Sequence, residues 1–347
     1  MHELFFTWQN RFLSPLLPFT TSPFLSPSPF HFSNKMPTNI SIQSTNISKR
    51  YGEKTALDDI SFDVAKGELF GFIGPDGAGK TTLFRIITSL LIPDSGSMTV
   101  QGLDTVKDYI KLRKILGYMP GRFSLYQDLT VEENLRFFAG IFHTTPEANY
   151  DLVKDIYSHI EPFKNRKAGK LSGGMKQKLA LSCALIHKPE VLILDEPTTG
   201  VDAVSRIEFW EMLDRLRQSG ITIVVSTPYM DEASRCDRVA LIQNGSIMSI
   251  NTPEGIRKNF GRKLWAARAD DIYGLLGDLR QFKATRTAFL FGEYIHLTLN
   301  DESATSAEIA SFLQAAGHSN VQISLIEPSI EDCFMEMMSA ESDASES

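Results

Sequence analysis

The sequence predicts an α/β fold with a mixed or parallel sheet and a helical insertion, followed by a small α+β domain. From Ile40 onward, short apolar segments alternate with helical segments, and a glycine-rich string follows one of the apolar segments. Near Phe260 the order of the elements changes. Apolar strands that alternate with helices are typical of a parallel sheet covered on both faces, whereas the new order indicates a second folding unit.

The composition is that of an ordinary globular protein and disfavours several other classes. The chain has 347 residues, of which 42% are hydrophobic and 22% are charged, and this length suits two or three domains. The net charge of −7 disfavours a nucleic-acid partner and a polybasic membrane anchor, because both require excess positive charge. No segment approaches the about 20 consecutive apolar residues of a membrane span. Any membrane function is therefore expected to need another chain.

The cysteines indicate a reducing compartment. Cys183, Cys236 and Cys333 are odd in number and far apart in the sequence. This spacing fits neither a disulfide framework nor a paired-cysteine metal site.

Both ends of the chain differ in composition from the rest. Residues 1–35 contain seven of the 23 phenylalanines and five of the 16 prolines, without helix or strand periodicity. We interpret them as a disordered extension or as mis-assigned upstream sequence before a true start at Met36; a weak targeting leader is the alternative. Residues 341–347 form an acidic, serine-rich tail that is expected to be solvated.

The first domain is expected to span residues 36–260. Apolar runs predict strands of the parallel sheet at 60–64, 69–73, 191–194 and 221–225. Helical periodicity predicts helices at 81–91, 131–142 and 150–163 and one that ends near His187. The stretch of about 125–185 between the strands is expected to be a helical insertion.

The second domain is expected to span residues 261–340. Its pattern predicts strands at 264–268, 285–291, 294–299 and 321–326. Helices are expected at 270–281, 305–316 and 329–338, the last of them capped by Ser329. The order β-α-β-β-α-β corresponds to the split βαβ motif, which favours a small α+β domain.

A phosphate-binding loop is predicted where the strand 69–73 meets the helix that follows. The string fits G-x-x-x-x-G-K-[ST], in which backbone N–H groups surround phosphates, Lys80 reaches the β- and γ-phosphates, and Thr81 offers its hydroxyl to Mg²⁺. The ATP-binding candidates are Gly74, Pro75, Asp76, Gly77, Ala78, Gly79, Lys80, Thr81 and Thr82.

Two carboxylates follow the apolar strand 191–194. They stand at its C-terminal end, the edge of a parallel sheet where ligands collect. Asp195 is the expected metal ligand together with Thr81, and Glu196 is the expected catalytic residue that polarises the attacking water.

A second anion-binding helix start is predicted at Ser172-Gly173-Gly174, with Gln177 one turn further on. Taken in order, the loop at Gly74, this Ser-Gly-Gly segment, Asp195-Glu196 and the segment ending at Asp202 resemble the ATP-binding subunit of ABC transporters. The resemblance covers about residues 40–260 and is strongest to subunits of drug or antibiotic exporters.

The resemblance implies a P-loop ATPase cassette that works as a head-to-tail dimer. ATP and Mg²⁺ on the loop around Lys80 would be covered by the signature residues Ser172 and Gly174 of the opposite subunit, with Asp202 in the dimer contact. Tyr51 falls where the family places an aromatic residue that stacks on adenine. The implied partners are a second identical or related ATP-binding subunit and transmembrane permease subunits. The implied location is peripheral, on the cytoplasmic face of the cell membrane.

Two positions depart from the family pattern. Gly121 stands where the family usually has a glutamine, and Pro228 stands where it has a histidine that contacts the γ-phosphate. Proline has no side-chain donor. Since Lys80, Asp195 and Glu196 are intact, we expect a working but slow ATPase.

The resemblance also suggests where the membrane partner binds. Phe123, Leu125 and Tyr126 are candidates for this contact, with ordinary core packing as the alternative. The alternative function is a weakly hydrolysing nucleotide-sensing regulator or a soluble ABC ATPase without a transport role.

Overall fold

The computed structural model describes residues 39–121, 125–300 and 305–345. The extension at 1–35 and Phe123 lie outside these ranges. The chain divides into two compact units. The first runs to Tyr229 and includes Ile242–Ile247, and the second comprises Met230–Leu241 and the chain from Met248.

The first unit contains an antiparallel sheet with the strand order β2-β1-β4-β5. Its strands are β1 (Ile40–Tyr51), β2 (Lys54–Ala65), β4 (Ser95–Val100) and β5 (Leu103–Asp104). The strand predicted at 60–64 is part of β2, so its assignment to the parallel sheet was wrong. The alternation of buried Phe62 and Val64 with exposed Ser61 and Asp63 is typical of an antiparallel strand with one covered face.

The parallel strands of the first unit have the order β3-β8-β7-β6. They are β3 (Leu69–Ile73), β6 (Leu116–Met119), β7 (Val191–Asp195) and β8 (Thr222–Thr227). Every residue of β3, β7 and β8 is buried, as expected for strands covered on both faces. Since the strands are parallel, their carboxyl ends meet at one edge of the sheet.

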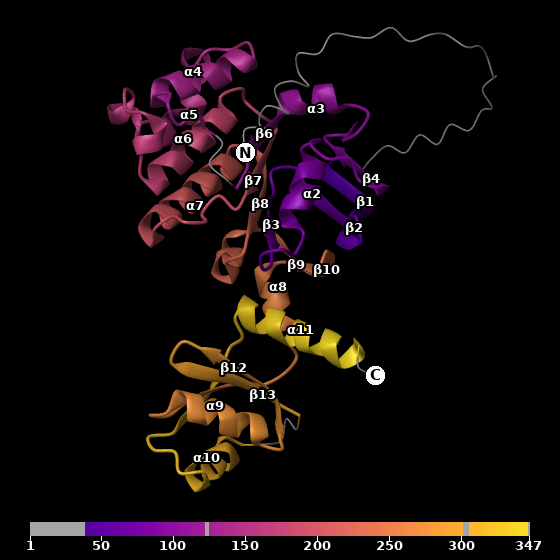
Figure 1. The fold of residues 1–347 in the computed structure, drawn as a ribbon, viewed down its shortest axis with the longest axis vertical. Coiled ribbons are helices and arrows are strands. Elements are labelled where there is room, and N and C mark those ends of the chain that lie inside the picture. The colour runs from indigo at the N-terminus through magenta and orange to yellow at the C-terminus, as the bar shows by residue number, and fades with distance from the viewer. Residues whose placement is uncertain (1–38, 122–124, 301–304, 346–347) are drawn as a thin grey trace, which may run out of the picture. The chain divides into compact units, whose positions relative to one another are not determined.

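The first unit also contains helices. They are α2 (Lys80–Ile87), α3 (Tyr109–Ile115), α4 (Val131–Ile141), α5 (Tyr150–Tyr157), α6 (Gly173–Leu185) and α7 (Ala203–Gln218), with short 3₁₀ turns η1 (Glu147–Asn149), η2 (Glu161–Phe163) and η3 (Ala168–Lys170). The insertion helices α4, α5 and α6 gather as one group (Figure 1). Thr130 and Glu133 form a capping box that defines the start of α4.

Two predicted helices were too long. The helix predicted at 81–91 ends at Ile87, because Ser89 adopts a left-handed φ of 57°. The helix predicted at 150–163 ends at Tyr157 and is followed by η2. Pro162 lies in η2 and has no backbone N–H to donate to the carbonyl group four residues before it, so a regular α-helix does not continue through this segment.

Between Tyr229 and Phe260 the chain forms four short elements. They are η4 (Met230–Arg235), β9 (Arg238–Gln243), β10 (Ser246–Asn251) and α8 (Pro253–Lys258).

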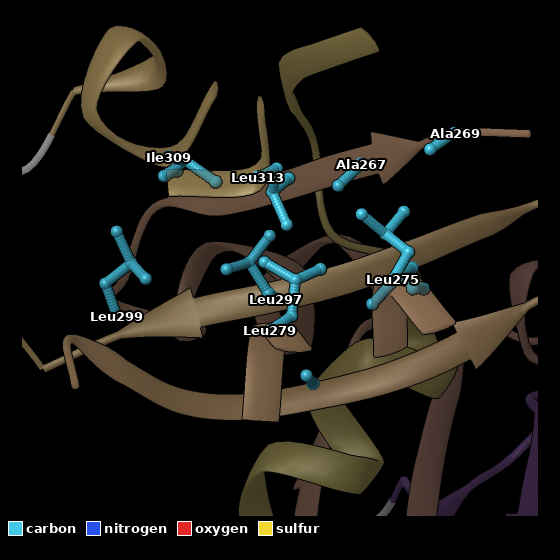
Figure 2. Packing of buried hydrophobic residues seen from close by; sticks show 10 residues of the cluster. Ala267, Ala269, Leu275, Leu279, Leu297, Leu299, Ile309 and Leu313 are labelled. Atoms are coloured by element: carbon cyan, nitrogen blue, oxygen red, sulfur yellow. The ribbon is translucent and has the colours of Figure 1, made fainter. Parts of the chain in front are cut away.

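The remainder of the second unit is an antiparallel sheet with two helices on one face. The strands β11 (Leu264–Arg268), β12 (Thr285–Phe291), β13 (Tyr294–Leu299) and β14 (Gln322–Ile326) have the order β12-β13-β11-β14. The helices α9 (Ile272–Gln281) and α10 (Ser306–Ala315) complete the predicted β-α-β-β-α-β sequence of elements. Leu275 and Leu279 of α9 meet Leu297 of β13 and Leu313 of α10 in a fully buried core (Figure 2).

The last helix, α11 (Ile330–Ser345), is joined to the sheet by a polar network. The backbone N–H and the hydroxyl of Ser329 both donate to Asp332 Oδ2, at 2.8 and 2.6 Å. The other carboxylate oxygen of Asp332 lies 2.7 Å from His296 Nδ1 of β13. The helix was predicted to end at 338, but it continues to Ser345 and so includes most of the tail that was expected to be solvated.

Asp332→Asn is expected to weaken the attachment of α11. Burial opposes ionisation of Asp332, but the hydrogen bonds from His296 and Ser329 outweigh it and lower its pKa. The carboxylate therefore stabilises the fold at neutral pH, and this contribution is lost as the pH falls through the lowered pKa. We expect the opening free energy of α11 amides at pH 7 to fall by about 1–3 kcal/mol in hydrogen exchange. The exposed neighbour Glu331→Gln is the control, and equal exchange in both variants would contradict this role.

Candidate functional site

The glycine-rich loop connects β3 to α2 and has the backbone shape that the motif requires. Gly79 caps α2 with a left-handed φ of 104°. A Cβ at this position would lie 2.5 Å from the carbonyl oxygen of Ala56. Glycine is therefore needed here for both its conformation and its size. The loop thus opens α2 at the carboxyl edge of the parallel strands, as predicted.

Lys80 is held at the centre of this loop. Its side chain is 3% exposed, and Nζ donates to the carbonyl oxygens of Gly74 at 2.8 Å and Pro75 at 3.0 Å. Nζ also lies 3.4 Å from Glu196 Oε1. A buried ammonium group needs such oxygen partners, and phosphate oxygens have the same acceptor chemistry.

Thr81 and Asp195 come together across the sheet edge. Thr81 Oγ1 donates to Asp195 Oδ1 at 3.3 Å, and Ser226 Oγ donates to the same oxygen at 2.7 Å. A hydroxyl and a carboxylate are hard oxygen donors, and Mg²⁺ commonly takes one or two carboxylates and completes its shell with water and substrate phosphates. The predicted pair therefore fits a magnesium ion.

The environment of Asp195 acts on its ionisation in two directions. Burial raises the pKa of its carboxyl group above the usual range. The hydrogen bonds from Ser226 and Thr81 and the charge of Lys80 act in the opposite direction. These neighbours offset part of the effect of burial, and the net result is a raised pKa.

Glu196 lies in a tight turn after β7. Its φ of 49° is left-handed, which is uncommon for a residue other than glycine. Its N–H donates to the carbonyl oxygen and to the hydroxyl of Ser226, at 3.1 and 3.0 Å. Thr199 Oγ1 lies 3.5 Å from Glu196 Oε2. The side chain is 23% exposed, so it has access to water while its backbone is held.

The signature segment forms the start of α6. The hydroxyl of Ser172 accepts from the N–H of Met175 at 3.3 Å, so Ser172 is the N-cap that the sequence predicts. Asp202 caps α7 in the same way, through the N–H of Ser205. Gly174 and Gln177 line a narrow crevice together with Pro197, Thr198, Val201 and Ser205.

Residues predicted to contact ligand or partner have unequal exposure. Tyr51, at the end of β1, is 47% exposed, which agrees with a free ring face. Leu125 is 6% exposed, so the structure favours its packing alternative over a partner contact. Tyr126 is half-buried against Phe137, with ring centroids 4.8 Å apart.

Gly121 borders the acidic pair. A Cβ at Gly121 would lie 2.9 Å from the carbonyl oxygen of Asp195 and 3.6 Å from Glu196 Cβ. The loop after β6 thus approaches the end of β7 closely because residue 121 has no side chain. Pro228 follows Thr227, the last residue of β8, two positions after Ser226.

Ser226 contacts both acidic residues, although no motif in the sequence predicts a role for it. The available signal was its position, since it is a polar residue at the C-terminal end of the apolar run 221–225. Polar residues at the carboxyl ends of neighbouring parallel strands share one edge of the sheet.

Comparison with known proteins identifies the family. A family model for ABC transporters matches residues 57–199. The linearmycin resistance ATP-binding protein LnrL of Bacillus subtilis (strain 168) is 35% identical over 289 residues, which cover 82% of this chain and 89% of that protein. This chain belongs to the ABC transporter family. The resemblance predicted from the motifs is thereby confirmed.

Other relatives and solved structures agree with this ABC assignment. The probable multidrug ABC transporter ATP-binding protein YbhF of Escherichia coli (strain K12) is 39% identical over 229 residues, 65% of this chain but only 40% of YbhF. The dimeric structure of MJ0796, a bacterial ABC transporter cassette, superposes with a TM-score of 0.56 at 26% identity, covering 61% of this chain and 98% of the cassette. The predicted P-loop cassette fold is therefore confirmed.

None of the helices in the described ranges has both the length and the apolar character needed to cross a bilayer.

Proposed function

We propose that this ABC chain binds and hydrolyses ATP and that this reaction drives a membrane exporter. One observation carries the proposal: Lys80, Thr81, Asp195 and Glu196 meet at the carboxyl edge of β3 and β7. Lys80 Nζ lies 3.4 Å from Glu196 Oε1, and Thr81 Oγ1 lies 3.3 Å from Asp195 Oδ1. A cation, a metal-binding pair and a general base at one edge are the parts that phosphoryl transfer to water requires.

Each residue has a distinct role in this reaction. The loop N–H groups and the Lys80 ammonium bind the triphosphate and neutralise its charge. Bound Mg²⁺ would be held by Thr81 and Asp195 and would neutralise further phosphate charge. Glu196 accepts the proton of the attacking water, which its carboxylate also orients. Tyr51 offers its exposed ring to the adenine.

The coupling to transport is inferred from the relatives. YbhF is named a probable multidrug transporter protein, LnrL a linearmycin resistance protein, and another relative a Nod factor export protein. We infer that the cassette spans residues 36–260, that 261–340 form an accessory domain, and that permease subunits hold the protein at the cytoplasmic face of the membrane. ATP joins two cassettes, identical or related, and hydrolysis separates them.

A steady-state assay of the full chain tests this function. With Mg-ATP the purified protein should release phosphate continuously, and EDTA should abolish the release. Absence of turnover both alone and in membranes that contain co-expressed permease subunits would contradict the proposal.

A second candidate function is that of a nucleotide-sensing regulator that hydrolyses ATP only very slowly. Gly121 and Pro228 favour this function. Neither residue offers a side-chain hydrogen-bond donor beside the reacting phosphate. This candidate differs from the first in its rate, since a regulator binds ATP without appreciable turnover.

Pro228→His is expected to increase kcat by about tenfold. A preorganised donor near developing charge contributes roughly 10²–10³ in rate, and an added imidazole should recover part of that contribution. Pro228→Ala, which removes the ring without adding a donor, is the control and should stay within about twofold of the parent. Phosphate release at saturating Mg-ATP is the measurement. Equal rates for the His and Ala variants would show that residue 228 does not limit hydrolysis.

A further inference from the structure

The end of β8 carries a buried hydroxyl that contacts both acidic residues. Ser226 is 0% exposed. Its Oγ donates to Asp195 Oδ1 at 2.7 Å and accepts from the Glu196 N–H at 3.0 Å. One side chain thus bonds the carboxylate of one residue and the backbone of the next.

The contact with Glu196 fixes a strained conformation. A left-handed backbone at a residue other than glycine is strained and persists only where its surroundings hold it. The Glu196 N–H reaches both oxygens of Ser226, and the Glu196 carboxylate lies 3.4 Å from Lys80 Nζ. The turn that carries the general base is therefore bonded to β8 through Ser226.

The contact with Asp195 fixes a carboxylate in a low-dielectric site. A buried carboxylate oxygen needs hydrogen-bond donors, and Ser226 supplies the shorter of the two hydroxyl contacts to Asp195 Oδ1. Removing the hydroxyl leaves Thr81, at 3.3 Å, as the weaker donor to the same oxygen. Gly121, which borders this turn, has no side chain that could donate another hydrogen bond to Asp195.

We propose that Ser226 is a positioning residue for ATP hydrolysis, because its hydroxyl holds the Asp195 carboxylate and the Glu196 backbone in one arrangement. This inference rests on the proposed ATPase function. The Lys80 ammonium bonds to the carbonyl oxygens of Gly74 and Pro75 and pairs with Glu196, and these contacts do not involve the Ser226 hydroxyl. Loss of the hydroxyl should therefore reduce the chemical step and leave nucleotide binding nearly unchanged.

Steady-state kinetics of the full chain test the proposal. Ser226→Ala is expected to lower kcat by about 10–100-fold, because positioned acid–base groups contribute about 10²–10⁴ in rate and only part is lost. The dissociation constant for ATP, measured by fluorescence with a labelled analogue, should change by less than about threefold. The substitution does not remove the interactions that bind the ground state and the transition state equally.

A matched pair of variants separates positioning from packing. Ser226→Thr and Ser226→Val add the same volume at this buried site, but only threonine keeps a hydroxyl. The threonine variant should exceed the valine variant in kcat by at least about tenfold, with similar thermal unfolding midpoints. Equal kcat for this pair, or equal kcat for parent and Ser226→Ala, would overturn the proposal. A parent protein without turnover would instead remove the ATPase function on which the proposal depends.

Discussion

Glu196→Gln is expected to slow ATP turnover by about a hundredfold or more while ATP remains bound. Glutamine has nearly the same shape but cannot accept a proton from water, and general-base catalysis contributes about 10²–10⁴ in rate. The Glu196 backbone is held by Ser226 through its N–H, so the substitution should leave the turn intact. Single-turnover phosphate release, with ATP binding measured in parallel, checks the result.

The control for this prediction is a surface glutamate in the same unit. Glu147 has a side chain that is 66% exposed and pairs with Arg136, so Glu147→Gln should retain the parent rate. Turnover of Glu196→Gln at the parent rate would remove Glu196 from the mechanism.

Lys80→Ala is expected to weaken ATP binding by roughly a hundredfold. A charge-assisted hydrogen bond contributes about 1.5–3 kcal/mol, and a loss near the upper value corresponds to about this change in Kd. The structure adds a second consequence, because Glu196 and the carbonyl oxygens of Gly74 and Pro75 lose their cationic partner. Isothermal titration with Mg-ATP measures the effect.

Two further variants isolate the role of Lys80. Lys80→Arg keeps the charge but replaces a compact ammonium with a wide planar group, so it should bind ATP poorly in this buried loop. Lys111→Ala removes a lysine that is 75% exposed and should bind ATP like the parent. Parent-like affinity in Lys80→Ala would mean that the loop binds triphosphate without its lysine.

The candidate site could be predicted from the sequence because its residues stand at the ends of helices and strands. Lys80 and Thr81 open α2, and Asp195 ends β7, so a parallel sheet necessarily brings them to one edge. Ser226 was missed because a single serine after an apolar strand has no distinctive spacing. The left-handed turn at Glu196 could not be predicted either, since it depends on contacts from β8.

The errors in the predicted helices and strands had local physical causes. Leu90 and Leu91 continue the apolar pattern of α2, but both N–H groups bond back to Arg85 after the left-handed Ser89. The segment 60–64 belongs to an antiparallel sheet, because its apolar residues alternate with the exposed Ser61 and Asp63 and so cover only one face. The strands and helices from β11 to β14 lie close to their predicted bounds, since Gly292 and the helix caps Asp271 and Thr305 are explicit turn and cap signals. The start of the second unit was predicted at residue 261, whereas this unit includes Met230–Leu241 and the chain from Met248.

We propose that two ATP-bound copies join, with Ser172 and Gly174 of one copy covering the loop of the other. Sedimentation velocity of the full-length Glu196→Gln protein, with and without saturating Mg-ATP, measures this association. We predict twice the monomer mass only with Mg-ATP, and a monomer when Ser172→Arg is added, because a bulky side chain at the start of α6 blocks its contact with the loop of the other copy. A protein that binds Mg-ATP at saturation and still sediments as a monomer would contradict the claim.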